Sequence, residues 1–328
     1  MKRDRRGATP RSTLRLARSQ SVPPFDPSTA APHALRSLLF RKGRRATLAA
    51  LAALLLPACK QPGASGSATR VISLSPSTTE AVYAIGAGPL LVGRSKHCDY
   101  PPEAQALPVV GGYADPSLEA IIALNPTAVV GARGPAGPAL EQALTTRGLT
   151  TFFPETESIA QIEAMLGELG RLLHAEAGAA GAIARLRAKK DAITAAVAPL
   201  PRVRVALLFD VAPIVAAGPG GFPDELIRLA GGENVITQGG PYPTLNIEHL
   251  LALNPHVLLD GMSDTGMPGG SGPGIPRDGP GFRELSAVRE GRVRALATST
   301  ALRPGPRIGD GLASIARAIH GDALKVPL

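Results

Sequence analysis

The sequence predicts an α/β protein with two similar lobes joined by one long helix. Short apolar strands alternate with helices of about ten residues, which favours parallel sheets with helices on both faces. Residues 159–197 contain no proline and are rich in Ala, Leu, Arg, Glu and Lys, which is typical of a long helix. A nine-residue pattern occurs once on each side of this stretch. The two halves therefore look like copies of one unit.

The composition excludes several classes of protein. The chain has 328 residues, of which 44% are hydrophobic and 19% charged, so it can build a core and is not disordered throughout. Two cysteines are too few for a disulfide scaffold. Residues 1–58 hold 12 Lys and Arg against 2 Asp and Glu, while residues 59–328 hold 23 against 24. The net charge of +9 therefore belongs to the N-terminal segment, and we expect no nucleic-acid partner.

Residues 1–58 are interpreted as an N-terminal extension that ends in a lipoprotein signal peptide. A basic cluster at residues 41–45 precedes an uncharged run of eleven residues, 46–56, which is short for a membrane span. Leu56-Pro57-Ala58-Cys59 then resembles a bacterial lipoprotein box, although Pro57 departs from its usual small residue. This resemblance implies that Cys59 is lipidated, and residues 59–69 read as a flexible tether. A short buried Ala/Leu helix is the alternative.

The first half alternates strands with helices. A capping box of Ser77 and Glu80 predicts a helix that ends at Gly86, and Asp115 with Pro116 predicts the start of another. Strands are expected at 70–75, 91–93, 128–131 and 150–153, and a third helix at 138–147.

The middle of the chain predicts helices that end at Pro199 and Pro201. Gly178 and Gly181 weaken this stretch, so it could be two helices. We expect an inter-lobe helix at 175–199 between lobes at 70–174 and 200–328. Strands at 203–209, 257–259 and 292–297 and a closing helix at 308–319 are expected in the second lobe.

The repeated pattern places one glutamate at the same position in each half. Glu119 and Glu248 each begin a segment that ends in Ala-Leu-Asn-Pro, and 129 residues separate them. An apolar strand follows both segments. Because the spacing is too long for a solenoid, the repeat indicates two lobes. A chance match of a helix stop is the alternative.

Several motifs taken together resemble one family. They are RVISLSPSTTE at 70–80, CDYPP at 98–102, the two repeated segments, and GGEN at 231–234. With the signal peptide and the long helix, they resemble the periplasmic solute-binding proteins of cobalamin, haem and iron-siderophore ABC importers, closest to the cobalamin-binding branch. The resemblance covers residues 69–320. It implies two Rossmann-like lobes joined by one long backbone helix, with a ligand cleft between the lobes.

The resemblance also implies a function and partners. The chain would be a substrate-binding receptor that delivers a corrinoid to a permease dimer with its ATPase subunits. Haem or a ferric siderophore is the alternative ligand. We expect a periplasmic monomer, lipid-anchored to the membrane, with the metal chelate as its ligand and no cofactor. Glu119 and Glu248 would dock on the permease, although both could serve only to compensate helix dipoles.

The resemblance assigns ligand-binding roles to residues from both lobes. These are His97, Tyr113, Arg133, Phe209, Tyr242, Ser299 and Arg303, with Arg307 as a further candidate. Tyr113 and Tyr242 occupy matching places, each six residues before its glutamate, where cobalamin-binding relatives carry Trp. His97 could contact the ligand or coordinate its metal, or be an ordinary loop residue. The chain has no Trp, and Ala132 and Ser299 also depart from relatives, so the cleft is less aromatic than expected.

An exported α/β enzyme and a sensory receptor are the competing functions. The sequence has neither a phosphate-binding G-x-x-x-x-G-K-[ST] loop nor a G-x-S-x-G nucleophile motif. Cys98 reads as a free thiol, and no paired Cys or His motif indicates a resident metal. We therefore expect no catalytic residues and no enzyme activity.

Overall fold

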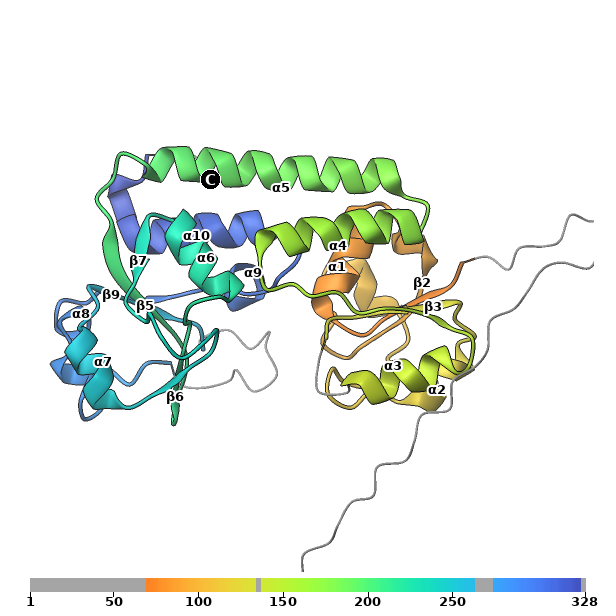
Figure 1. Cartoon of the computed structure of the whole chain (residues 1–328), viewed down its shortest axis with the longest axis horizontal. Coiled ribbons are helices and arrows are strands. Elements are labelled where there is room, and N and C mark those ends of the chain that lie inside the picture. Colours follow the sequence, from red (N-terminus) through yellow and green to blue (C-terminus); the bar gives the residue numbers. More distant parts are fainter. Residues whose placement is uncertain (1–68, 134–136, 263–273, 326–328) are drawn as a thin grey trace, which may run out of the picture. The chain divides into compact units, whose positions relative to one another are not determined.

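A computed structural model describes residues 69–133, 137–262 and 274–325, except for the side chains of residues 298 and 299. The structure contains two separate sheets, one toward each end of the molecule, and α5 runs along the same side of both of them (Figure 1). This arrangement confirms the predicted fold class of two α/β lobes joined by a long helix.

The first lobe contains a four-stranded sheet in which every pair of strands is parallel. Its order is β2-β1-β3-β4. The strands are β1 Val71–Ser73, β2 Leu91–Arg94, β3 Ala128–Val130 and β4 Thr150–Phe152. Val71 packs in the cluster that contains α1 and α4, whereas Ile72 packs with residues of α2 and α3. Successive side chains of a strand point to opposite faces, so helices cover the sheet on both sides.

Two helices of the first lobe begin at residues other than those predicted. The helices are α1 Pro76–Ala84, α2 Leu118–Ala123 and α3 Gly137–Thr145. Ser75, not Ser77, caps α1 by accepting a hydrogen bond from the Thr78 N–H. The predicted capping box is therefore wrong. The prediction that α2 starts at Asp115 is also wrong, because Ser117 caps this helix and accepts from the Ala120 N–H.

The central helical stretch is two helices, α4 Ile159–Leu172 and α5 Glu176–Val197. The break lies at His174, which adopts φ 54°, and not at the glycines. Gly178 lies inside α5. A Cβ at this position would lie 1.9 Å from the carbonyl oxygen of Ile85, just after α1, so there is no room for a larger residue. The glycine thus allows α5 to lie close against the first lobe. With 22 residues, α5 is about 33 Å long.

The second lobe contains a mixed sheet, where a parallel one was expected. Its strands are β5 Val203–Val211, β6 Ile214–Ala216, β7 Gly232–Asn234, β8 Thr244–Leu245, β9 Val257–Asp260 and β10 Val293–Ala295. The order is β10-β9-β5-β6-β8, β7 also pairs with β5, and β6 is antiparallel to β5 and β8. The hairpin forms because an Asp210 carboxylate oxygen accepts from the N–H groups of Val211 and Ala212.

Helices pack around the second sheet, and a continuous core joins the lobes. The helices are α6 Phe222–Leu229, α7 Ile247–Leu253, α8 Ser286–Arg289, α9 Thr298–Ala301 and α10 Ile308–His320. One cluster of buried side chains runs from Val71 of β1 through Leu166 and Leu186 to Leu207 of β5. The two lobes therefore share a core through α4 and α5. No helix within the described residues is both long and apolar enough to cross a membrane.

Candidate functional site

A cavity of about 400 Å³ lies between the lobes, within the usual range for small-molecule sites. Both lobes contribute side chains. Its lining includes Ser75, Ser77, His97, Tyr113 and Arg133 of the first lobe, Thr156 and Glu157 of the loop between β4 and α4, and Phe209, Phe222, Tyr242 and Arg303 of the second lobe.

Most of the residues assigned by resemblance come together in this cavity. His97, Tyr113, Arg133, Phe209, Tyr242 and Arg303 all line it. Ser299 lies in α9, but its side chain is outside the described part, as is Cys59. Arg307 does not line this cavity and belongs to the wall of a separate one beside α5. Their roles in binding a ligand remain predictions.

The tyrosine of the first lobe is fixed by its own lobe. The Tyr113 hydroxyl donates to the backbone oxygen of Arg133 at 2.6 Å. Burial, together with the negative charge of Glu157, raises the pKa of Tyr113 above its ordinary value. The phenol is therefore neutral at physiological pH and presents an aromatic wall with a polar edge.

The tyrosine of the second lobe has a different environment. Tyr242 packs edge-on against Phe209, with ring centroids 5.6 Å apart, and its hydroxyl donates to a Glu157 carboxylate oxygen at 3.2 Å. Burial and Glu157 raise the pKa of Tyr242 well above the ordinary tyrosine value. Glu157 was not predicted from the sequence, because it lies in a connection without a recognisable motif.

Arg133 reaches the cavity but already has an acidic neighbour. Its Nε lies 2.7 Å from a Glu155 oxygen, and both side chains are more than half exposed. Such an exposed pair contributes little to stability, so Arg133 is available to a ligand at modest cost.

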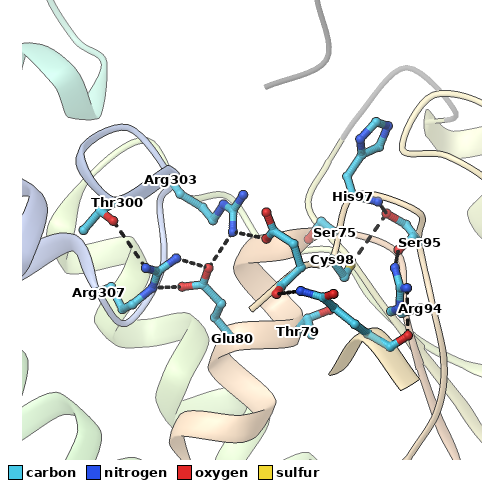
Figure 2. Close-up of polar contacts among 12 residues, drawn as sticks. Ser75, Thr79, Glu80, Arg94, Ser95, His97, Cys98, Thr300, Arg303 and Arg307 are labelled. Atoms are coloured by element: carbon cyan, nitrogen blue, oxygen red, sulfur yellow. Dashed lines mark hydrogen bonds and ion pairs between the residues drawn. The ribbon is translucent and has the colours of Figure 1, made fainter. Parts of the chain in front are cut away.

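Arg303 takes part in a buried ion-pair network that joins the two lobes. Its Nη1 donates to Glu80 of α1 at 2.7 Å and to Asp99 at 2.9 Å. Arg307 donates to both oxygens of Glu80, and its guanidinium lies 3.9 Å from the centroid of the Tyr100 ring. Figure 2 shows Glu80 between the two arginines, which come from the opposite lobe.

This network locks the lobes together beside the cavity. The side chains of Glu80 and Arg303 are only 2% and 7% exposed. Removing one partner from a buried ion pair costs about 3–5 kcal/mol, because the remaining charge stays buried. The sequence analysis placed Glu80 in a capping box and so missed this role. Nothing in the local sequence around Glu80 indicates a partner 223 residues away.

A group of hydroxyls occupies the start of α1 at the cavity wall. Ser75 Oγ lies 3.1 Å from Ser77 Oγ and accepts from the Ala132 N–H at 2.9 Å. Cys98 is buried, its thiol lies 3.6 Å from Ser95 Oγ, and burial raises the pKa of that thiol. His97 is half-buried, and its backbone N–H donates to Ser95 Oγ. The side chain of His97 extends away from the ion-pair network (Figure 2).

The glutamates predicted to dock on a permease occupy matching places. Glu119 and Glu248 are exposed and lie in the first turns of α2 and α7. Both helices lie on the side of the sheets remote from α5 (Figure 1). In the part of the chain that the structure covers, no group of three or more His, Cys, Asp or Glu side chains could hold a metal ion.

Comparisons with known proteins agree with this geometry. Residues 71–300 match the family described as periplasmic binding protein. The vitamin B12-binding protein of Vibrio parahaemolyticus is 31% identical over 262 residues, which are 78% of this chain and 90% of the relative.

Solved structures include proteins with two kinds of ligand. The periplasmic vitamin B12-binding protein BtuF of Vibrio cholerae is 28% identical, with a TM-score of 0.66 over 78% of this chain and 98% of its own. The periplasmic haem-binding protein RhuT of Roseiflexus is 26% identical, with a TM-score of 0.68 over 79% and 100%. Family, fold and cavity point to a binding protein and not to an enzyme. This chain belongs to the periplasmic binding protein family.

Proposed function

We propose that the protein is the substrate-binding receptor of an ABC importer, and that it binds a corrinoid between its lobes and delivers it to the membrane permease. The observation that carries the proposal is the cavity between the lobes, with one tyrosine from each lobe on its wall. Relatives named vitamin B12-binding protein match over most of their length. The corrinoid would be cargo, with no resident cofactor.

The chemistry of the wall fits a flat macrocycle. Tyr113, Phe209 and Tyr242 offer aromatic surface, while hydroxyls and guanidinium groups offer donors for polar substituents at its edge. His97 contributes an imidazole that could face the metal or the ligand's edge. Because Tyr replaces Trp at two places, the stacking area is smaller than in a Trp-lined cleft.

Haem is the second candidate ligand. The cavity contains two phenol groups and one imidazole, which are groups that can coordinate iron. The haem-binding protein RhuT has the same fold. A ferric siderophore is the remaining alternative, with Arg133 available to its acidic groups.

The proposal includes anchoring to the membrane and docking on the permease. Lipidated Cys59 and the tether at 59–69 would hold the protein near the bilayer as a periplasmic monomer. Its lobes would comprise residues 70–174 and 200–328, joined by the helix at 175–199. Glu119 and Glu248 would dock on the permease dimer. Support comes from the exposure of both carboxylates and from their matching helices on one side of the protein.

A titration tests the proposal. Purified protein is titrated with cyanocobalamin, haemin and a ferric siderophore, and binding is followed by absorbance and calorimetry. We expect one-to-one binding of cyanocobalamin with a dissociation constant of about 1 µM or tighter. Tighter binding of haemin would favour the second candidate. Binding of none of the three would contradict the function.

A further inference from the structure

The ion-pair network between the lobes separates two cavities. Arg303 lines the ligand cavity, whereas Glu80 and Arg307 line a second cavity of about 600 Å³. Both arginines bind the carboxylate of Glu80. Figure 2 shows this carboxylate between the two guanidinium groups. Glu80 and Arg307 therefore lie behind the wall of the ligand cavity and not in its lining.

The second cavity extends from the network to α5. Its lining includes Tyr83 of α1, Ala182 and Leu186 of α5, and Asp310 of α10. It thus borders both lobes and the helix that joins them. Both lobes also line the ligand cavity, but no described residue of α5 does. With increasing distance from α5, the order is therefore the second cavity, the ion-pair network and the ligand cavity.

The helix α5 holds the lobes together on its own side. It lies close to the first lobe at Gly178, and its Lys189 forms an ion pair with Asp310 of α10 in the second lobe. The core that the lobes share runs through α4 and α5. Lobes that are held on one side open by turning about that side. Their separation then increases with distance from α5, so the ligand cavity cannot widen unless the ion-pair network stretches.

The network is stronger than the contact between Tyr242 and Glu157, which also joins the lobes at the ligand cavity. The Glu80 side chain is 2% exposed and accepts hydrogen bonds of 2.6, 2.7 and 2.8 Å from Arg303 and Arg307. The bond from Tyr242 is 3.2 Å long, and its acceptor Glu157 is exposed. Buried charges that separate lose their partners without gaining water, whereas exposed groups bind water instead. The network therefore resists opening more than the Tyr242 contact does.

We propose that Glu80, Arg303 and Arg307 form a clamp that limits how far the lobes open about α5, and that Glu80 thereby sets the rate of ligand release. Glu80 is a positioning residue, because it acts through the spacing of the lobes and does not line the ligand cavity. The control of release rests on the proposed function. The control of spacing is a property of the fold and is tested without ligand.

The spacing of the lobes is measured first. In the full chain with Cys59→Ser, spin labels are attached at Gln142→Cys on α3 and Arg289→Cys on α8, two exposed positions in different lobes. Cys98 is buried and does not compete for the label. Electron–electron double resonance should give one narrow distribution of distances when the clamp is intact. Glu80→Gln, which keeps the shape of the side chain but removes its charge, should add longer distances.

Ligand release is measured next, as the loss of radiolabelled cyanocobalamin from the protein in an excess of unlabelled ligand. Glu80→Gln should release it about tenfold faster or more, and Arg307→Gln, whose side chain is less buried, about threefold faster. Arg307→Gln carries both measurements if Glu80→Gln does not fold.

Arg185→Gln is the matched control. The Arg185 side chain also lines the second cavity, but it donates from α5 to the carbonyl of Ala84 and does not join one lobe to the other. This variant should leave the distances unchanged and alter the release rate by less than about twofold.

A disulfide across the same junction tests whether the spacing of the lobes is the cause. A Cβ added at Gly305 would lie 3.7 Å from Ser77 Cβ, which is a spacing that a disulfide can bridge. Ser77→Cys with Gly305→Cys, in the chain with Cys59→Ser, should therefore link the lobes when oxidised. With Glu80→Gln added, oxidation should return the release rate to within about twofold of the same chain with Glu80, and reduction should restore fast release.

The outcomes separate the clamp from the proposed function. Folded Glu80→Gln and Arg307→Gln that keep the wild-type distances and release rate would overturn the clamp and leave the proposed function intact. A disulfide that forms but does not slow release from Glu80→Gln would do the same. Wild-type protein that binds no cyanocobalamin would instead contradict the proposed function, and the distances alone would then decide whether the clamp exists.

Discussion

The two lobes are similar at the ends of the helices that carry the repeat and different at the cavity wall. Asn125 and Asn254, from the two copies of the repeat, both adopt left-handed conformations, with φ 46° and 38°. Arg70 donates to the carbonyl of Leu124 at the end of α2, and Arg204 donates to the carbonyl of Leu253 at the end of α7. The repeat therefore preserves the same helix end in both lobes, which explains its Asn-Pro.

At the cavity the matching tyrosines have different partners. Tyr113 donates to a backbone carbonyl of its own lobe, whereas Tyr242 donates to Glu157, which lies in the loop between β4 and α4 of the first lobe. The duplicated sequence thus places an aromatic ring on each wall but does not determine its polar contacts. Tyr113 is fixed within its own lobe, whereas the polar contact of Tyr242 depends on a loop of the other lobe.

The largest expected effect concerns permease capture by Glu119 and Glu248, to which the two lobes should contribute alike. The double variant Glu119→Arg with Glu248→Arg should weaken capture by the permease about tenfold or more, because both ends of a two-sided contact change from attraction to repulsion. Ligand affinity should not change. Binding of loaded protein to the permease with its ATPase subunits in proteoliposomes measures the effect.

A matched variant separates docking from helix stability. Glu176→Arg reverses an exposed charge in the first turn of α5, so it carries the same helix-dipole cost on another surface. It should leave capture unchanged. If the double variant is captured as well as wild type, the two carboxylates serve only their own helices.

A smaller effect should separate the two tyrosines. Tyr113→Phe should lower the free energy of unfolding by about 1 kcal/mol, because a short bond to a backbone carbonyl is lost from a half-buried site. Tyr242→Phe should change it by less than about 0.5 kcal/mol, because the bond lost is longer, at 3.2 Å, and its acceptor Glu157 is exposed. Urea denaturation measures both. Equal losses of unfolding free energy in the two variants would show that the Tyr113 and Tyr242 hydroxyls are held equally strongly.

The smallest effect concerns alkaline pH. Because burial and Glu157 raise the pKa of Tyr242, the folded protein keeps this proton at a pH where the unfolded chain releases it. The stability that this group contributes is complete below about pH 10 and is lost as the pH rises above it. Tyr242→Phe should therefore lose stability less steeply than wild type above pH 10. A steeper loss would contradict the raised pKa.

Local sequence patterns predicted most strands and helices of the lobes, and the family resemblance supplied the residues that line the cavity, but neither predicted the contacts between the lobes. Strand alternation and the repeated Asn-Pro reflect interactions within a few residues, so they can be read from the sequence. The Glu80–Arg303 pair joins positions 223 residues apart, and a carboxylate in a helix looks the same with or without a partner. The sequence analysis missed the hairpin formed by β5 and β6 after Asp210. The strand β6 is short, and only Asp and Pro mark the turn before it.

A crystal structure of the protein with cyanocobalamin tests the central claim most directly. The account predicts the corrin ring between Tyr113 and Tyr242, within the cavity that both lobes line. A bound corrinoid on an outer surface, with this cavity still filled by solvent, would contradict it.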